Sequence, residues 1–416
     1  MAPRFTGLWR DRDFLRFWAA HSISLVGTGL GAIPFTAILV LDAGPLEMAL
    51  VAAASLAPAL VFGLPAGVWA DRLHRRPILI AADLGRAAML AGVLAAWWAD
   101  VLRVEHLYAV AFVNGALATF FDVAAQAYIP ALVPRDDLVE ANSKLSASAS
   151  VAELGAFSLG GAIVQFAGAI WAVGSDAVSF LASALFVARI RRPEPARDAR
   201  AGDQQHALKE VAEGLRAVAH DPLQRSLAVA SASRHLTYGM VGAIILLYGT
   251  RTLGLGPGAL GVIFGVGGAT SLVGALLADR LTRRLGVGPA MVGSMVVGSL
   301  GGYFIVAAHG GPWLAAFFLV LSQLVVDPAT SVEDISETSL RQAATPERLR
   351  GRVGAGVRTL SLSLELCGAL AAGVLAQSVG LRAVLVIGLL PRLAGALWLL
   401  ASPVMRIRAP GEANRA

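Results

Sequence analysis

The stretch that decides the fold is "GVWADRLHRRP", Gly67 to Pro77, in which an aspartate and several arginines stand between two long apolar runs. A weaker copy, "ALLADRLTRR", occupies Ala275 to Arg284. Charged side chains are costly inside a bilayer, so a short charged segment between apolar runs indicates a turn at the membrane surface. The repetition raises the question of why one chain carries the same charged segment twice.

The composition supports a membrane protein. Hydrophobic residues make up 56% of the 416 residues, charged residues only 15%, and the mean hydropathy is +0.67. Soluble domains usually contain about a quarter charged residues, so this chain lacks the polar surface of a soluble globule. The net charge of +6 does not indicate a nucleic-acid partner, because the basic residues cluster between the apolar runs.

The apolar runs predict an all-α membrane protein with twelve transmembrane helices, since a helix needs about 20 apolar residues to cross the bilayer. The expected spans are residues 14–41, 46–70, 77–99, 105–129, 144–167, 170–188, 223–250, 257–278, 286–308, 312–333, 352–376 and 380–402.

The distribution of the 34 lysines and arginines predicts the orientation. Most of them fall on the side that holds both termini, whereas the other side holds only Arg103, Arg251 and Arg382. Basic residues favour the cytoplasmic side. We therefore expect a multi-pass protein of the cytoplasmic membrane with both termini in the cytoplasm.

The only long connection predicts the domain boundaries. Residues 1–188 form one six-helix bundle, residues 189–222 a cytoplasmic linker, and residues 223–416 a second bundle. In the linker, Leu208, Val211, Leu215 and Val218 recur at helical spacing. This stripe predicts either a helix on the membrane surface or a solvated helix with a weak apolar face.

Landmarks in the two halves repeat at nearly constant offset. Asp71 corresponds to Asp279, and Glu153 in "VAELGA" corresponds to Glu365 in "SLELCG". Such matches indicate an internal duplication, with two bundles packed around a pseudo-two-fold axis along the membrane normal.

These features together resemble the major facilitator superfamily, whose signature loop is similar to the segment at Gly67. The phrases "WAVGSDAVSFLASALFVARIRRP" and "PERLRGRV" are similar to the drug:proton antiporter-3 group, which includes macrolide efflux proteins and the enterobactin exporter. The resemblance implies the major facilitator fold. It also implies a proton antiporter that exports an antibiotic- or siderophore-type molecule and contributes to multidrug resistance. One departure is "GAFSLGG", Gly155 to Gly161, which lacks the proline that exporters of this superfamily usually carry there.

The resemblance also implies that the charged segments latch the two halves together on the cytoplasmic side, with a partner near Arg352. The alternative is that the arginines merely follow the positive-inside rule. The expected gating residues are Gly67, Asp71, Arg72, Arg75 and Arg76 in the first half, and Asp279, Arg280, Arg283 and Arg284 in the second.

Glu153 and Glu365 are the first candidates for proton coupling, because both are predicted near the bilayer centre, where an ionised carboxylate is costly. Glu153 could instead pair permanently with Arg234 or Arg392, or donate a hydrogen bond between helices as the protonated acid. Asp122 and Asp327, closer to the cytoplasmic ends, are further candidates. Asp83 and Arg86 are expected to form a local pair on one helix.

Aromatic and polar residues predicted within the spans could line a central substrate cavity, although such aromatics are more often lipid-facing or packing residues. They are His21, Phe35, Phe120, Phe121, Arg234, His235, Tyr238 and Gln323. The expected partners are a small-molecule substrate, protons and the lipid bilayer, for a protein that works as a monomer.

No enzyme is predicted. The histidines lack metal-ligand spacing and no phosphate-binding loop of the Walker type is present, so we expect neither a catalytic residue, a metal nor a cofactor. Two alternatives to proton-coupled export stay open: a transporter without proton antiport or with a lipid-like substrate, and a membrane scaffold or sensor that transports nothing.

Overall fold

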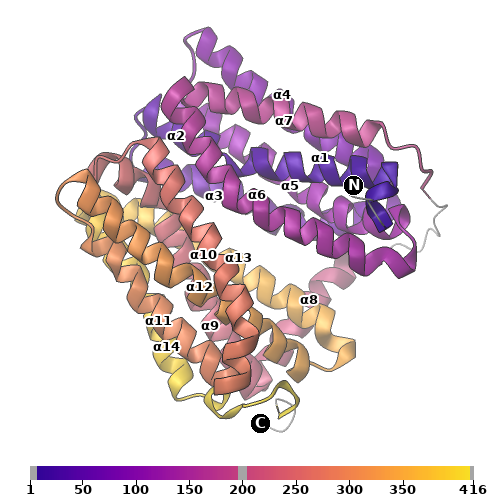
Figure 1. Ribbon diagram of the computed structural model, residues 1–416, viewed down its shortest axis with the longest axis vertical. Coiled ribbons are helices and arrows are strands. Elements are labelled where there is room, and N and C mark those ends of the chain that lie inside the picture. The colour runs from indigo at the N-terminus through magenta and orange to yellow at the C-terminus, as the bar shows by residue number, and fades with distance from the viewer. Residues whose placement is uncertain (1–6, 195–203, 413–416) are drawn as a thin grey trace, which may run out of the picture. The chain divides into compact units, whose positions relative to one another are not determined.

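The computed structural model describes residues 7–194 and 204–412, including all their side chains except those of residues 64, 68, 70–72, 153, 154, 204–208 and 410. Every regular element in these ranges is a helix (Figure 1). This confirms the predicted all-α fold.

Fourteen α-helices and six short helices make up the described chain. The α-helices are α1 (Arg12–Gly29), α2 (Ala32–Leu39), α3 (Pro45–Arg72), α4 (Arg75–Trp98), α5 (Val104–Leu132), α6 (Leu138–Ala167), α7 (Ala169–Ala188), α8 (Gln204–His220), α9 (Pro222–Leu247), α10 (Pro257–Leu285), α11 (Val287–Ala307), α12 (Pro312–Ala344), α13 (Arg350–Val379) and α14 (Leu381–Leu400). The short ones are η1 (Gly7–Arg10), η2 (Arg135–Asp137), η3 (Tyr248–Thr252), η4 (Glu347–Leu349), η5 (Pro403–Arg406) and η6 (Pro410–Glu412).

Eleven helical stretches in the described residues are long and apolar enough to cross a membrane. They coincide with eleven of the twelve predicted spans. The remaining predicted span is α9, which has 26 residues but carries Arg225, Arg234 and His235 and is less apolar. The chain is therefore a multi-pass membrane protein.

The first predicted span is broken near its middle. Gly31 has a φ of 65°, in the left-handed region that favours glycine, and it separates α1 from α2. A close approach of α6 adjoins this break: a Cβ atom at Gly160 would lie 2.1 Å from the carbonyl oxygen of Leu30. Glycine at position 160 therefore permits the backbone of α6 to contact the end of α1.

Several helices extend beyond the predicted spans. α6 begins at Leu138 rather than at residue 144, α10 ends at Leu285 rather than 278, and α12 ends at Ala344 rather than 333. Hydropathy reports where the hydrocarbon layer ends, whereas a helix continues as long as its backbone hydrogen bonds are satisfied. The polar extensions were consequently read as loops.

The chain divides into two compact units. The first comprises Met1–Ala43 and Ala54–Gln204, and the second comprises Gly44–Ala53 and Gln205–Ala416. In the first unit, α4 and α7 run side by side (Figure 1), and buried residues such as Phe17, Leu79 and Tyr128 form a core cluster. In the second, a core cluster that includes Met291 and Met295 joins α9, α11, α12 and α14.

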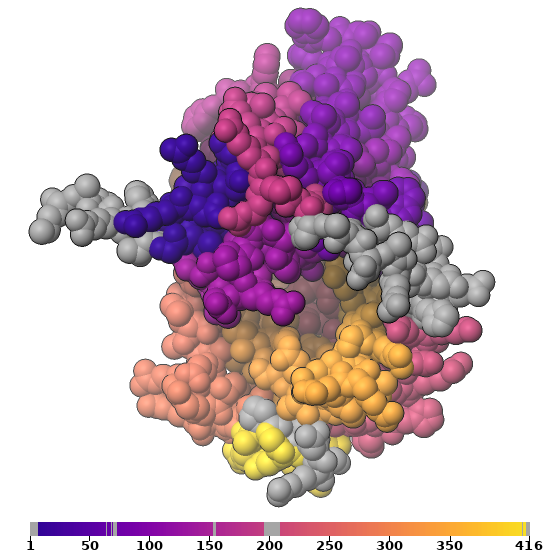
Figure 2. All heavy atoms as spheres, turned by 90° about the vertical axis from the view of Figure 1, so that its right-hand side faces the viewer, coloured from indigo at the N-terminus to yellow at the C-terminus, as the bar shows by residue number. Residues whose placement is uncertain are grey.

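The linker helix α8 packs against the start of α13 in the second unit. Val218 is buried together with Val353 and Val357. Arg352 lies 2.9 Å from the carboxylate of Glu213 and 3.6 Å from that of Glu210. Figure 2 shows α8 in pink beside the orange start of α13. Part of the predicted apolar stripe is therefore covered by protein, while Leu208 lies outside the described side chains.

Candidate functional site

The central feature of the second unit is a contact between two ionisable side chains, His235 of α9 and Glu365 of α13. The Nδ1 atom of His235 lies 2.8 Å from the Oε2 atom of Glu365. Their side chains are 25% and 22% exposed. Both residues were predicted site residues in different roles, and the structure brings them together.

Glycines position this pair. A Cβ atom at Gly239, one helical turn after His235, would lie 1.9 Å from the carbonyl oxygen of Glu365. A Cβ atom at Gly368 would lie 2.4 Å from the carbonyl oxygen of Leu236. Each helix thus presents a glycine to a carbonyl group of the other, and the backbones approach closely enough for the two side chains to bond.

An imidazole and a carboxylate in contact can share a proton. With one proton between them the two groups carry no net charge, and with none they carry one negative charge. The ring of Tyr238 lies edge-on to that of His235, with 5.8 Å between the ring centroids. A titratable group and an aromatic ring therefore adjoin each other on one face of α9.

A buried ionic network lies next to this pair, because Arg234 precedes His235 in α9. Arg234 contacts Glu333 at 3.2 Å and Glu337 at 3.0 Å, and it also binds Asp334. All three acids belong to α12. Arg234 therefore fixes α9 to α12 through buried charge-assisted hydrogen bonds.

Arg392 of α14 joins the same network. Its Nη2 atom lies 2.7 Å from Glu333 and 2.9 Å from the hydroxyl group of Thr330. Arg341 binds Glu337 from the next turn of α12. The network thus contains Arg234, Arg341 and Arg392 against Glu333, Asp334 and Glu337, and its formal charges balance.

Sequence reasoning missed the three acids of α12, because Glu333 was the last residue of the predicted tenth span and Asp334 and Glu337 fell in an apparent loop. An i, i+4 spacing between Glu333 and Glu337 was the available signal for one helix face. Arg234 and Arg392, predicted as possible partners of Glu153, instead bind carboxylates of α12. The side chain of Glu153 lies outside the described residues.

The first unit contains a smaller buried cluster. Asp83 and Arg86 form the expected local pair at 3.9 Å. Arg86 also donates to Thr28 of α1 at 2.6 Å and lies 3.7 Å from the ring centroid of Phe180 in α7. These contacts connect α1, α4 and α7. Asp122, a proton-coupling candidate, is exposed on α5.

The aromatic cavity candidates of this unit are largely packing residues. The ring of His21 is stacked between Phe17 and Phe121, at centroid distances of 6.0 and 6.1 Å. Phe35 is fully buried and Phe121 nearly so, whereas Phe120 packs against Phe62 and Trp69. The Nδ1 atom of His21 is buried with no hydrogen-bond partner among the described residues.

The last two candidates of the second unit lie together on α12. A Cβ atom at Gly267 of α10 would lie 2.2 Å from a carboxylate oxygen of Asp327 and 2.3 Å from the amide nitrogen of Gln323. Glycine at position 267 therefore makes room for both polar side chains between α10 and α12.

The two charged segments differ in their surroundings. Arg76 binds the carbonyl groups of Val187 and Ala188 at 3.2 and 2.6 Å, which fixes the start of α4 to the end of α7. Asp279 and Arg283 form an exposed pair at 2.5 Å. In the first segment Gly67 is half-buried and Arg75 donates its backbone N–H to Glu194, while the side chains of Asp71 and Arg72 lie outside the described residues. In the second segment Arg280 and Arg284 are exposed.

A metal site in the described part of the chain would require several ligand side chains close together. No group of three or more histidine, cysteine, aspartate or glutamate side chains is arranged there to hold a metal ion.

Known proteins resemble this chain over nearly its whole length. Bacillus subtilis (strain 168) contains YfiS, an uncharacterized MFS-type transporter that is 25% identical over 414 residues, covering 96% of this chain and 95% of that protein.

Solved structures show the same fold. An inward-facing bacterial homologue of the iron transporter ferroportin aligns with a TM-score of 0.76 at 18% identity, covering 95% of this chain and 99% of that chain. A bacterial homologue of the human lysosomal transporter Spinster aligns with a TM-score of 0.72 at 14% identity, covering 97% and 98%. The nucleoside transporter NupG aligns with a TM-score of 0.73 at 14% identity, covering 94% and 99%.

Two of these names refer to different substrates, iron and nucleosides, so the likeness bears on the architecture of the chain and on no particular cargo. The family model of the Major Facilitator Superfamily matches residues 17–364. On this match, the chain belongs to the major facilitator superfamily of membrane transporters.

Proposed function

We propose that this protein exports a small amphipathic molecule, of the drug, antibiotic or siderophore type, from the cytoplasm in exchange for protons. The observation that carries the proposal is the contact of 2.8 Å between His235 and Glu365. Two groups able to share a proton there lie half-buried within a bundle of membrane helices.

Glu365 and His235 act as one proton-carrying unit in this proposal. The deprotonated pair has one negative charge, which is costly in a low-dielectric environment unless a cation compensates it. A proton provides one such cation, and a positively charged substrate provides another. Because either cation compensates the single negative charge, the proton and the substrate bind alternately, which is the requirement for antiport.

The buried network holds this unit in place. Arg234 and Arg392 are already compensated by acids of α12, so neither cation neutralises Glu365 permanently. Asp334 differs from its neighbours because half of its side chain is exposed, and we assign it as a further carboxylate accessible to a cationic substrate. Tyr238 supplies an aromatic surface beside His235.

The two charged segments act as the cytoplasmic latch in the same scheme. Screened ion pairs worth about 1 kcal/mol or less each suit a contact that must open and close in every transport cycle. The exposed pair between Asp279 and Arg283 is of this weak kind, although it joins two turns of α10. The scheme assigns both termini to the cytoplasm and treats the monomer as the working unit.

Flux without proton exchange is the second candidate, and the proline-free sequence "GAFSLGG" in α6 favours it. One experiment separates the two. The purified protein in liposomes is given a cationic amphiphile, tetraphenylphosphonium, and a pH-sensitive dye reports protons while substrate efflux is followed. Proton movement coupled to substrate movement supports antiport.

Substrate movement at the same rate with and without a pH gradient, and without a proton signal, would establish the second candidate. Absence of flux for a panel of cationic, neutral and lipid-like amphiphiles would instead support the scaffold alternative.

A further inference from the structure

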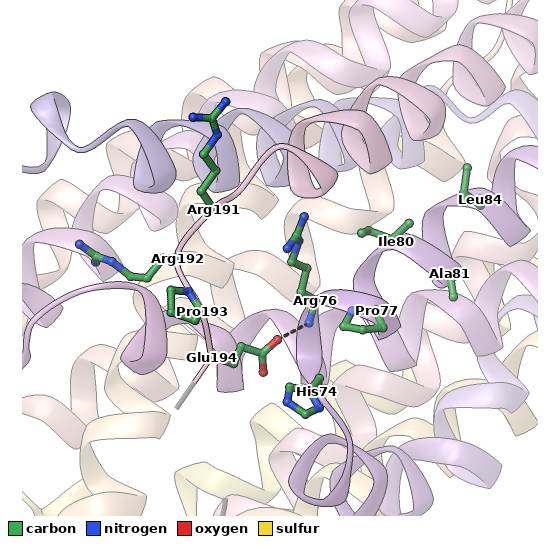
Figure 3. Close-up of a pocket in the computed structure, with 10 residues that line it drawn as sticks. All are labelled: His74, Arg76, Pro77, Ile80, Ala81, Leu84, Arg191, Arg192, Pro193 and Glu194. Atoms are coloured by element: carbon green, nitrogen blue, oxygen red, sulfur yellow. Dashed lines mark hydrogen bonds between the residues drawn. The ribbon is translucent and has the colours of Figure 1, made fainter. Parts of the chain in front are cut away.

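A basic pocket lies in the first unit, and its described lining includes the expected gating residue Arg76 but no residue assigned to proton or substrate binding. Its lining comes from residues 74–84 at the start of α4 and residues 191–194 after α7, and its volume is about 680 Å³ (Figure 3). We refer to it as the arginine pocket, after Arg76, Arg191 and Arg192.

The charges of the arginine pocket do not cancel. Glu194, the one acid among the described lining residues, accepts hydrogen bonds from the backbone N–H groups of Arg75 and Arg76 at 2.9 and 2.8 Å, so this carboxylate already compensates the N-terminus of α4. Among the described lining residues three guanidinium groups stand against one carboxylate, and Asp11, outside the lining, compensates Arg192. The pocket is complementary to an anion.

The arginines differ in the donors they have left. Arg76 is engaged with the carbonyl groups at the end of α7. Arg192 binds the carbonyl oxygen of Leu132 and lies 3.3 Å from Asp11, which leaves N–H groups of its planar fork unused. The exposed guanidinium of Arg191 forms no ion pair with any of the described acids. The guanidinium N–H groups of Arg191 are thus available to a ligand.

An apolar wall extends from this basic rim. Pro77, Ile80, Ala81 and Leu84 recur at helical spacing along α4, and Leu84 is 46% exposed. α4 and α7 are both candidate membrane spans. The arginines therefore lie where a span meets the membrane surface, and the apolar wall leads from them into the hydrocarbon layer.

We propose that the arginine pocket binds an anionic phospholipid. The phosphate group accepts hydrogen bonds from Arg191 and Arg192, and an acyl chain lies along Ile80 and Leu84. Guanidinium groups match phosphate oxygens in bidentate geometry, and arginine near a membrane surface attracts anionic headgroups. A free phosphate ion would satisfy the arginines but leave the apolar wall uncovered.

Native mass spectrometry of the full-length protein in detergent tests this proposal. Phosphatidylglycerol, phosphatidylcholine and glycerol phosphate are titrated separately, and lipid-bound and lipid-free protein are counted. We expect phosphatidylglycerol to bind at least tenfold more tightly than phosphatidylcholine. Glycerol phosphate, which has no acyl chain, should not displace it at equal concentration.

Two variants with matched controls identify the site. Arg191→Gln removes a guanidinium with no ion-pair partner, so the fold should be kept and the affinity for phosphatidylglycerol should fall about fivefold. Arg189→Gln, which removes an exposed arginine outside the pocket, should leave it unchanged. Leu84→Ser should weaken binding, whereas Leu181→Ser on α7 should not.

Three results would overturn the proposal. Equal losses for Arg189→Gln and Arg191→Gln would reduce the effect to general surface charge. Equal affinity for the two lipids would remove the role of the headgroup charge. Displacement by glycerol phosphate would show a site for a soluble phosphate rather than a membrane lipid.

Discussion

Arg392 and Glu333 form a buried ion pair in which the Nη2 atom of the arginine lies 2.7 Å from the Oε2 atom of the glutamate, with side chains 3% and 0% exposed. Glu333 uses its other oxygen to bind Arg234 at 3.2 Å. One carboxylate therefore compensates two buried cations from two different helices, which makes it the common element of α9, α12 and α14.

Replacing Glu333 by Gln should destabilise the protein strongly. Arg392 would lose its carboxylate partner in a buried environment and Arg234 would lose one of three, and breaking a buried pair in this way costs about 3–5 kcal/mol. We expect a lower thermal unfolding temperature and less protein in the membrane fraction. Glu347→Gln, which affects an exposed side chain 3.7 Å from Arg350, is the matched control and should melt like the parent. Equal melting of the two variants would contradict this role for Glu333.

Glu365→Gln should separate substrate movement from proton movement. The amide can neither exchange a proton with His235 nor compensate a cationic substrate, so efflux driven by a pH gradient should fall at least tenfold, while exchange of a neutral amphiphile down its own gradient persists. His235→Gln should have a similar effect, since both groups belong to one unit. His309→Gln, at an exposed histidine outside the pair, is the control.

The pH-gradient assignment fails if Glu365→Gln retains gradient-driven efflux at the parental rate. Loss of both gradient-driven efflux and exchange of the neutral amphiphile would show that Glu365 is needed for more than its charge, which differs from the proposed role.

Gly239→Ala should impair transport through the backbone alone. The added Cβ atom would lie 1.9 Å from the carbonyl oxygen of Glu365, so α9 and α13 must shift apart and the bond to His235 must lengthen. Overpacking of this kind costs about 1–3 kcal/mol. Gly242→Ala, three residues further along α9 where a Cβ atom meets nothing within 4 Å, provides the control. Melting temperature and efflux should both change only in the first variant.

The two aspartates of the charged segments should respond differently to neutralisation. Asp71→Asn is expected to abolish transport and leave the protein in the membrane. Asp279→Asn removes only an exposed pair with Arg283, whose contribution should be small, so it should slow efflux less than tenfold. Efflux rates normalised to membrane-inserted protein provide the measurement. Unchanged transport by Asp71→Asn would contradict the latch.

The helical architecture was accessible from the sequence because each apolar run is about as long as the bilayer is thick. The ends of the helices could not be predicted from the sequence, since α12 continues past Glu333 into a polar extension that hydropathy cannot distinguish from a loop. That error concealed the acids Asp334 and Glu337, and with them the partners of Arg234.

The pairing of His235 with Glu365 was also beyond the sequence, although both residues were singled out. They lie 130 residues apart, and the sequence places each within a predicted span without fixing which way its side chain faces. The facing direction depends on how closely α9 and α13 approach. The glycines at 239 and 368 determine this approach, and a glycine within an apolar run is common in membrane helices.

The reciprocal glycine contacts of α9 and α13 limit what a proton can do in this molecule. Backbones that meet at Gly239 and Gly368 have no side chain between them, so we expect α9 and α13 to move together. Protonation of Glu365 is therefore not expected to act by separating α9 from α13. Its effect on the rest of the protein is instead electrostatic, because protonation changes the electric field at any charge that approaches these two helices.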